Sequence, residues 1–169
     1  TRRYGGYIIH AAMVVMFIGF TGNAFNSETR AEVADGDVFH LGPYTFTATQ
    51  IQHSENENYS SETLELEMKK NDEIITTLTP QKRYYFASEQ PSTEVGIYST
   101  LREDIYTVLS GRSNDGERVI IQVYRNPFVK FVWIGSFILV FGTIFAMIPN
   151  LRESKASRKK TTAPAGGEE

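Results

Sequence analysis

The chain has 169 residues, no cysteine and a formal net charge of −3. This length suits one domain of ordinary size, the lack of cysteine excludes disulfides, and the weak acidic charge gives no sign of nucleic-acid binding. The mean hydropathy of −0.28 is that of a soluble protein, but this average conceals two apolar blocks on either side of a polar middle.

The two apolar blocks predict transmembrane helices. Residues 4–25 carry no formally charged side chain, and residues 128–148 carry only Lys130. About 20 apolar residues cross the roughly 30 Å hydrocarbon core of a membrane as a helix. A cleavable signal peptide is the alternative for the first block, with Gly22-Asn23-Ala24 as its small-residue cleavage site.

Charged flanks predict the orientation of these helices. Basic residues precede the first block and follow the second, and short basic flanks stay on the cytoplasmic side. Residues 26–127 hold 17 Asp and Glu against 9 Lys and Arg, so this segment is free to be exported. We therefore expect cytoplasmic termini, a periplasmic domain over 26–127 and a disordered basic cytoplasmic tail over 149–169. The basic flanks are Arg2, Arg3, Arg152, Lys155, Arg158, Lys159 and Lys160.

The polar middle predicts an all-β domain. Residues 26–35 resemble a connector, 53–61 a polar loop, and 91–102 a loop or a short helical turn. Short strand-like segments without a long helix between them indicate a small antiparallel β-barrel or sandwich. The predicted strands are 38–41, 44–51, 63–68, 74–78, 83–87, 105–109 and 118–124. In 44–51 we expect Tyr44, Phe46, Ala48 and Gln50 to share the inward face.

The second apolar block carries small residues near one helical face. Gly135, Gly142 and Ala146 fall at this spacing, and small residues let two helices approach closely. This face of the second predicted helix therefore allows close helix packing.

His10 is the one ionisable side chain well inside a predicted membrane helix. It lies about 10 Å along the helix from Arg3, and an imidazole in hydrocarbon needs a partner. Neutral imidazole offers a lone pair that suits haem iron, and Gly6 one turn earlier leaves room for a flat group. A histidine hydrogen-bonded to a neighbouring helix is the alternative.

The remaining polar residues predict no catalytic site. His40 and His53 are spaced too loosely for a metal motif, so we expect both on the surface. Residues 82–85, Lys-Arg-Tyr-Tyr, are either a solvated strand end or a site for an anion such as a propionate. The charged run Glu94, Arg102, Glu103 and Asp104 is interpreted as ordinary surface.

Several segments together resemble one known family. The first block, with Arg2-Arg3-Tyr4-Gly5-Gly6-Tyr7-Ile8-Ile9-His10, is similar to a late membrane segment of CcmF, the haem lyase of bacterial cytochrome c maturation. Segments 80–85, 92–95, 101–106 and 122–133 are similar to its periplasmic domain and second span. The resemblance covers nearly all of residues 2–149, in the same order.

The resemblance implies a cofactor, a reaction and partners. The family attaches haem to apocytochrome c, takes haem from a membrane-tethered haem chaperone and works beside thiol-reducing partners at the bacterial inner membrane. It also holds a haem b within the membrane through two histidines, and His10 matches one of them. His10 is therefore the expected axial ligand to haem iron. For the protein as a whole, the lipid bilayer is a further expected partner and nucleic acid is not.

The sequence also departs from the family. The tryptophan-rich haem-handling segment and the outer haem-ligand histidines lie upstream of this region in the family, and the single tryptophan here is Trp133. The partner histidine for His10 is also absent from this sequence. We therefore expect a C-terminal piece or split subunit that needs the remainder of the lyase to act. A cofactor-free β-domain tethered to the membrane as a binding module is the alternative, and a membrane-anchored sensor is a third.

Reporter fusions test the predicted topology. A fusion at Asn71 should be active only for a periplasmic reporter, and one after Arg158 only for a cytoplasmic reporter, because basic flanks resist export. Strong periplasmic signal from the tail would disprove the hairpin.

Overall fold

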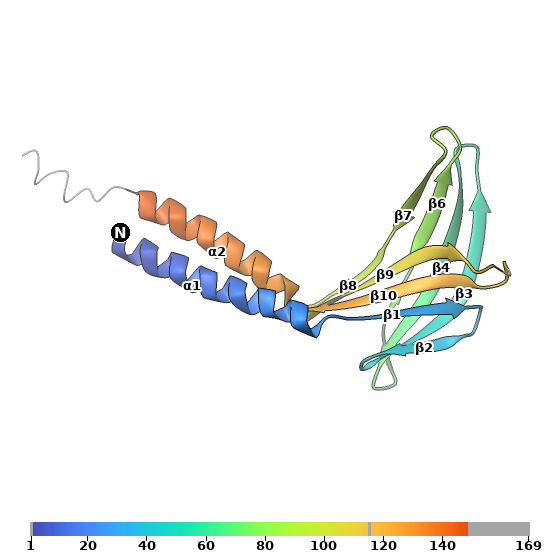
Figure 1. Cartoon of the computed structure of the whole chain (residues 1–169), viewed down its shortest axis with the longest axis horizontal. Helices are drawn as coiled ribbons and strands as arrows, with labels where there is room; N and C mark the ends of the chain where they lie inside the picture. The colour runs from blue at the N-terminus through green and yellow to red at the C-terminus, as the bar shows by residue number, and fades with distance from the viewer. Residues whose placement is uncertain (1, 115, 149–169) are drawn as a thin grey trace, which may run out of the picture. The chain divides into compact units, whose positions relative to one another are not determined.

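The computed structural model describes residues 2–114 and 116–148. These residues form two compact units: a pair of helices, and a β-domain over Thr21–Lys130 (Figure 1). The predicted disordered tail over 149–169 lies outside the described residues. Each unit follows from its own part of the sequence pattern.

The helical unit contains α1 (Arg2–Thr21) and α2 (Val129–Met147), which pack through small residues. A Cβ added to Gly142 would lie 2.7 Å from Ile8, and one added to Gly135 would lie 2.9 Å from the Ala12 carbonyl oxygen. A Cβ added to Gly5 would meet Ala146 at 2.5 Å. The predicted small-residue face is therefore confirmed, because no larger side chain fits these contacts.

The outer faces of both helices are apolar. Segments Tyr4–Phe25 and Val129–Met147 are each long and apolar enough to cross a membrane. Large side chains such as Phe17 and Phe137 are mostly exposed, although a soluble protein would bury such a continuous apolar surface. The first segment ends in a 3₁₀ turn, η1 (Gly22–Phe25), rather than in a continuing α-helix.

The β-domain is a sandwich of two antiparallel sheets. One sheet has the strand order β1-β10-β9-β8, and the other has the order β2-β3-β4-β6-β7 with β5 also paired to β4. Every strand pair is antiparallel, as predicted. The strands are β1 (Ser27–Val33), β2 (Val38–Leu41), β3 (Tyr44–Glu55), β4 (Tyr59–Lys70), β5 (Glu73–Leu78), β6 (Gln81–Tyr85), β7 (Gln90–Glu94), β8 (Gly96–Ser99), β9 (Glu103–Arg112) and β10 (Val119–Pro127).

Three segments predicted to be a connector or loops contain strands instead, so these predictions are wrong. The strands there bury few side chains, which is why the sequence did not reveal them. Segment 26–35 contains β1, which pairs with β10 and in which Val33 is the one buried residue. Segment 53–61 holds the ends of β3 and β4, which continue their ladder outside the core. Segment 91–102 contains most of β7, exposed at every residue, and all of β8. Such strands are held by backbone hydrogen bonds and lack the alternation that reveals a strand.

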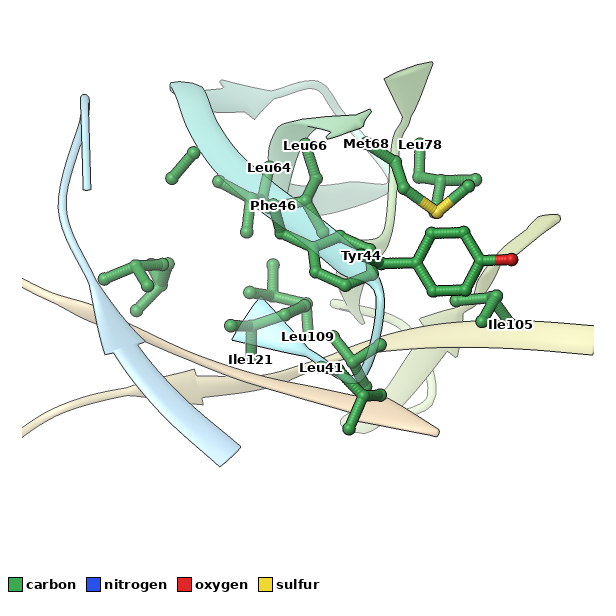
Figure 2. Close-up of a cluster of buried hydrophobic side chains, with 14 residues drawn as sticks. Leu41, Tyr44, Phe46, Leu64, Leu66, Met68, Leu78, Ile105, Leu109 and Ile121 are labelled. Carbon is green, nitrogen blue, oxygen red and sulfur yellow. The ribbon is translucent and has the colours of Figure 1, made fainter. Parts of the chain in front are cut away.

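The core lies between the two sheets, and Figure 2 shows its largest side chains. Phe46 is fully buried and stacks on Phe39 with ring centroids 5.2 Å apart. Both sheets contribute to this cluster: Leu41, Tyr44, Phe46, Ala48, Leu64, Leu66, Met68 and Leu78 from one, and Val33, Ile105, Leu109, Val119, Ile121 and Val123 from the other.

The inward face predicted for β3 is correct over its first half only. Tyr44, Phe46 and Ala48 are buried, whereas Gln50 is exposed. The pairing of β3 with β4 shifts register between Ala48 and Gln50, which marks a β-bulge. A bulge inserts one residue and so reverses the alternation, which turns Ile51 toward the core in place of Gln50.

Phe46→Ala should lower the free energy of unfolding of the β-domain by about 3–5 kcal/mol, because it leaves a cavity in a rigid core. Urea unfolding of the full chain in detergent, followed by the far-ultraviolet β signal, measures this loss. Phe86→Ala, at an exposed site, is the control and should change stability by less than about 0.5 kcal/mol. Equal losses in the two variants would contradict the packing described.

Candidate functional site

His10 lies on the exposed side of α1, one turn after Gly6. Its Nδ1 atom is 2.8 Å from the Gly6 carbonyl oxygen. A carbonyl oxygen only accepts hydrogen bonds, so Nδ1 carries the proton and donates it. In the neutral ring Nε2 then keeps its lone pair, as in a metal-ligating histidine whose other nitrogen donates to a backbone carbonyl.

The helix surface beside His10 has room for a flat ligand. A Cβ added to Gly6 would meet no heavy atom within 4 Å, in contrast to Gly5 on the packed face. If a haem were bound here, the Nε2 atom of His10 is the atom that would hold it. Among residues 2–114 and 116–148, no group of three or more His, Cys, Asp or Glu side chains is placed to hold a metal ion.

The other two histidines lie in the β-domain and are exposed, as predicted. The Nδ1 atom of His40 is 3.1 Å from the Thr45 hydroxyl, across the β2–β3 pair. His53 lies beyond the core on β3, opposite Glu62 in the ladder. Neither lies in a cluster with metal-binding geometry among the described residues.

The cations of segment 82–85 lie on β6 and are tied down within the domain. Arg83 forms an ion pair with Glu94 at 2.6 Å and lies over the Tyr59 ring, 5.1 Å from its centroid. Lys82 donates to the Ser110 carbonyl oxygen. Both cations therefore have partners within the domain. The interpretation of this segment as a solvated strand end did not include these contacts.

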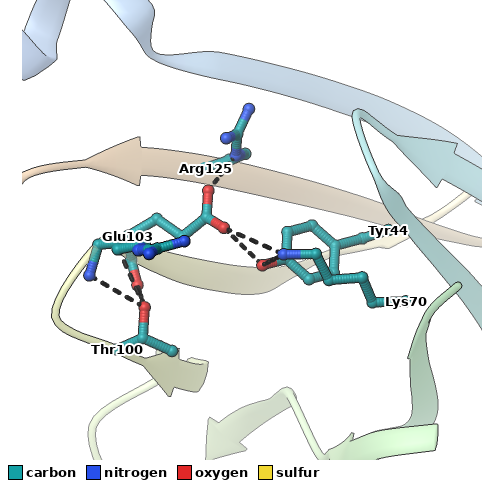
Figure 3. Close-up of polar contacts among 6 residues, drawn as sticks. Tyr44, Lys70, Thr100, Glu103 and Arg125 are labelled. Atoms are coloured by element: carbon teal, nitrogen blue, oxygen red, sulfur yellow. Dashed lines mark hydrogen bonds and ion pairs between the residues drawn. The ribbon is translucent and has the colours of Figure 1, made fainter. Parts of the chain in front are cut away.

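Glu103 forms the main polar junction of the β-domain, and the sequence interpretation missed it. The charged run was assigned to the surface, but Glu103 is only 8% exposed and Asp104 only 4%, so that assignment is wrong for both. Tyr44 donates its hydroxyl to Glu103 Oε1 at 2.6 Å, and Arg125 binds Oε2 through its Nε (Figure 3). Lys70 lies 3.9 Å from the same carboxylate.

This junction connects the two sheets. Tyr44 and Lys70 belong to β3 and β4, while Glu103 and Arg125 belong to β9 and β10. A buried carboxylate is costly unless its oxygens are hydrogen-bonded and its charge is matched, and this site meets both conditions. The junction therefore fixes how the ends of the two sheets meet.

The junction shifts the pKa of both acidic partners. Burial raises the pKa of the Tyr44 phenol well above its ordinary value, and the Glu103 carboxylate raises it further. Burial alone would raise the pKa of Glu103 as well, but hydrogen bonds from Tyr44 and Arg125 and the Arg125 charge outweigh it. The pKa of Glu103 is therefore held below its ordinary value of 4.5.

The turn before Glu103 is tied to the start of the second apolar helix. Thr100 donates its backbone N–H to the Glu103 carbonyl oxygen at 3.0 Å, and its hydroxyl receives the Glu103 N–H at 3.1 Å. The Phe128 N–H donates to the Arg102 carbonyl oxygen at 2.8 Å. Phe128 immediately precedes α2, so this turn is fixed at the point where the chain leaves the β-domain.

Comparison with known proteins gives consistent matches. The family model described as "CcmF C-terminal beta-sandwich" matches residues 24–127. The chain is 28% identical over 150 residues to the cytochrome c-type biogenesis protein CcmF of Pseudomonas aeruginosa, over 88% of this chain and 23% of that protein. It is 30% identical to CcmF of Pseudomonas fluorescens over 150 residues, with the same two shares.

Two further matches extend this picture. The cytochrome c-type biogenesis protein ccl1 of Rhodobacter capsulatus is 26% identical over 160 residues, over 94% of this chain and 24% of that protein. A solved structure of the cytochrome c heme lyase CcmF has a TM-score of 0.71 at 14% identity, over 88% of this chain and 25% of that chain. At this identity the structural match shows a shared fold. The chain spans about a quarter of the length of the curated relatives it matches.

Glu103→Gln should reduce the pH dependence of stability in acid. The folded-state pKa of Glu103 is lowered, so its contribution is present above about pH 4.5 and is lost as pH falls below that value. The difference in free energy of unfolding between wild type and variant should therefore shrink between neutral pH and about pH 3. Urea unfolding across this range measures it.

Glu94→Gln is the matched control, because Glu94 is also ion-paired but half-exposed. Its effect on stability should be small at every pH. If the Glu103→Gln difference stays constant down to pH 3, the charge of Glu103 does not stabilise the junction.

Proposed function

The chain belongs to the CcmF C-terminal β-sandwich family, and on this premise we propose that it is the C-terminal part of a cytochrome c haem lyase. In this proposal α1 supplies one axial ligand, His10, to a haem b embedded in the membrane. The β-domain provides a docking surface for partner proteins. The observation that carries the proposal is the free Nε2 of His10 beside the open surface at Gly6.

The proposal places both helices across the bacterial inner membrane with the β-domain in the periplasm. Its support is the apolar outer surface of α1 and α2 together with the distribution of charge. The β-domain is acidic, whereas basic residues lie before the first span and after the second. The domain boundaries in this topology are residues 4–25 and 128–148 for the spans and 26–127 for the periplasmic domain.

His10 has the chemistry of a haem ligand in a place where a free imidazole is costly. The Gly6 carbonyl fixes the tautomer and the ring orientation, so Nε2 is prepared for a metal. Burial of an unpaired imidazole nitrogen in hydrocarbon is unfavourable, and coordination removes that cost. The second axial ligand comes from the remainder of the lyase, on another helix.

A haem held at this position supplies one-electron transfer, which suits the reduction of incoming haem iron. By helical rise His10 lies nearer the cytoplasmic end of its span than the periplasmic end. This depth favours a role in electron transfer over one in thioether formation at the periplasmic surface. The residues of this chain hold and orient the ligand nitrogen, and the bond-forming site lies elsewhere in the lyase.

We propose that the β-domain contacts the proteins that take part in haem attachment. They are the membrane-tethered haem chaperone, apocytochrome c and its thiol-reducing partners. A cofactor-free tethered binding module is the competing function, and it predicts that His10 is dispensable.

His10→Ala in the complete lyase should convert or remove the six-coordinate haem b signal. Haem occupancy should fall at least about tenfold, a loss typical even of groups that only support a metal ligand. Absorption spectra of the purified protein measure the signal, and the yield of mature cytochrome c should fall in the same cells. Added imidazole should partly restore haem binding, because it replaces the missing nitrogen.

Val14→Ala is the matched control, one turn further along α1 and also exposed. It should leave the spectrum and the yield of cytochrome c unchanged. The isolated chain should bind haem weakly, since it supplies one ligand. An unchanged haem spectrum in His10→Ala would support the binding-module function instead.

A further inference from the structure

The turn between β8 and β9 carries a large aliphatic side chain at its tip. Leu101 is 69% exposed, and the neighbouring Arg102 is also exposed. Among the described residues Arg102 forms no ion pair, although the β-domain has an excess of carboxylates. An exposed leucine beside an unpaired arginine is the combination of groups that suits a membrane interface.

Hydrogen bonds close this turn and hold the backbone of Leu101 at its tip. Thr100 bridges the two ends of the turn. Its backbone N–H and its hydroxyl both donate to the Glu103 carbonyl oxygen, at 3.0 and 2.9 Å. The Thr100 hydroxyl also receives the Arg102 N–H at 3.3 Å. Glu103 is in turn held by the junction with Tyr44 and Arg125. The turn therefore presents the Leu101 side chain to the surroundings of the domain, where it is exposed.

The turn lies at the end of the β-domain where the chain enters the apolar segments. The Phe128 N–H binds the Arg102 carbonyl oxygen at 2.8 Å, and the apolar segment Val129–Met147 starts at the next residue. The strand pairing places Pro127 opposite Glu103 and Arg125 opposite Ser27. Phe25, the last residue of the other apolar segment, is 64% exposed at this same end.

We propose that the turn at residues 100–102 is a lipid-binding contact of the β-domain. Leu101 enters the boundary between headgroups and acyl chains, and Arg102 binds lipid phosphate. The proposal rests on the transmembrane topology given above, because the turn can meet the bilayer only if the adjoining segment spans it. With this contact the β-domain has a third attachment to the membrane besides its two chain connections.

The absence of cysteine makes a direct test possible, since one introduced thiol gives one labelling site. Leu101→Cys carries a bimane label in the full chain, reconstituted into vesicles of phosphatidylethanolamine and phosphatidylglycerol with headgroup spin-labelled lipid. Quenching at position 101 should be at least about twofold stronger than at a control label at Phe86→Cys, because interfacial groups lie about 5–10 Å into the headgroup boundary. Phe86 is exposed and follows β6 at the opposite end of the domain from the turn.

A third label distinguishes failure of this inference from failure of the topology. Phe137→Cys lies on the exposed side of α2 and should be quenched by lipid spin-labelled deep in its acyl chain. If position 137 is quenched but 101 is quenched no more than 86, the lipid contact is wrong and the topology stands. If position 137 is not quenched, the transmembrane topology is wrong. The proposed lipid contact is then wrong as well, because it depends on that topology.

Arg102→Glu, combined with the label at position 101, tests the headgroup contact. This substitution keeps the backbone carbonyl that Phe128 binds, so the turn itself should persist. Quenching at 101 should fall in vesicles with phosphatidylglycerol and change less in vesicles of phosphatidylcholine alone, because a carboxylate is repelled by anionic lipid. Equal quenching with and without the substitution in anionic vesicles would show that Arg102 binds no phosphate.

Discussion

One buried carboxylate, that of Glu103, links the ends of the two sheets of the β-domain. Glu103 accepts hydrogen bonds from Tyr44 in one sheet and Arg125 in the other, and the charge of Arg125 balances its own. This site fixes the first residue of β9, which in turn fixes the turn before it and the strand opposite. The apolar core gives most of the stability, while this junction decides how the sheet ends are aligned.

The parts of the fold that bury apolar side chains could be predicted from the sequence. The two apolar helices and the central strands carry clear patterns of hydrophobicity, and the structure contains all of them. The strands β1 and β7 were missed because their side chains are mostly polar and exposed, and β8 was missed because it is only four residues long. Their positions are set by hydrogen bonds to neighbouring strands, which a pattern of side chains does not record.

Of the two main polar sites, His10 and Glu103, one could be identified from the sequence and the other could not. His10 could be singled out from the sequence because an ionisable ring in an apolar helix stands apart from its neighbours. Glu103 could not, because it lies in a run of charges that looks like any solvated surface. Its partners Tyr44 and Arg125 are 59 and 22 residues away in sequence. The pairing of β9 with β10 brings Arg125 to Glu103, and the packing of the two sheets brings Tyr44 to it.

The pairing of β1 with β10 has a consequence for how such a protein can arise. The first strand of the sandwich lies beside the last, with Ser27 opposite Arg125, so the domain begins and ends at neighbouring points. A domain of this kind can be inserted into a tight loop between two helices without separating them. Since both chain ends of the sandwich lie side by side, a change in the size of the domain need not move its two connections apart.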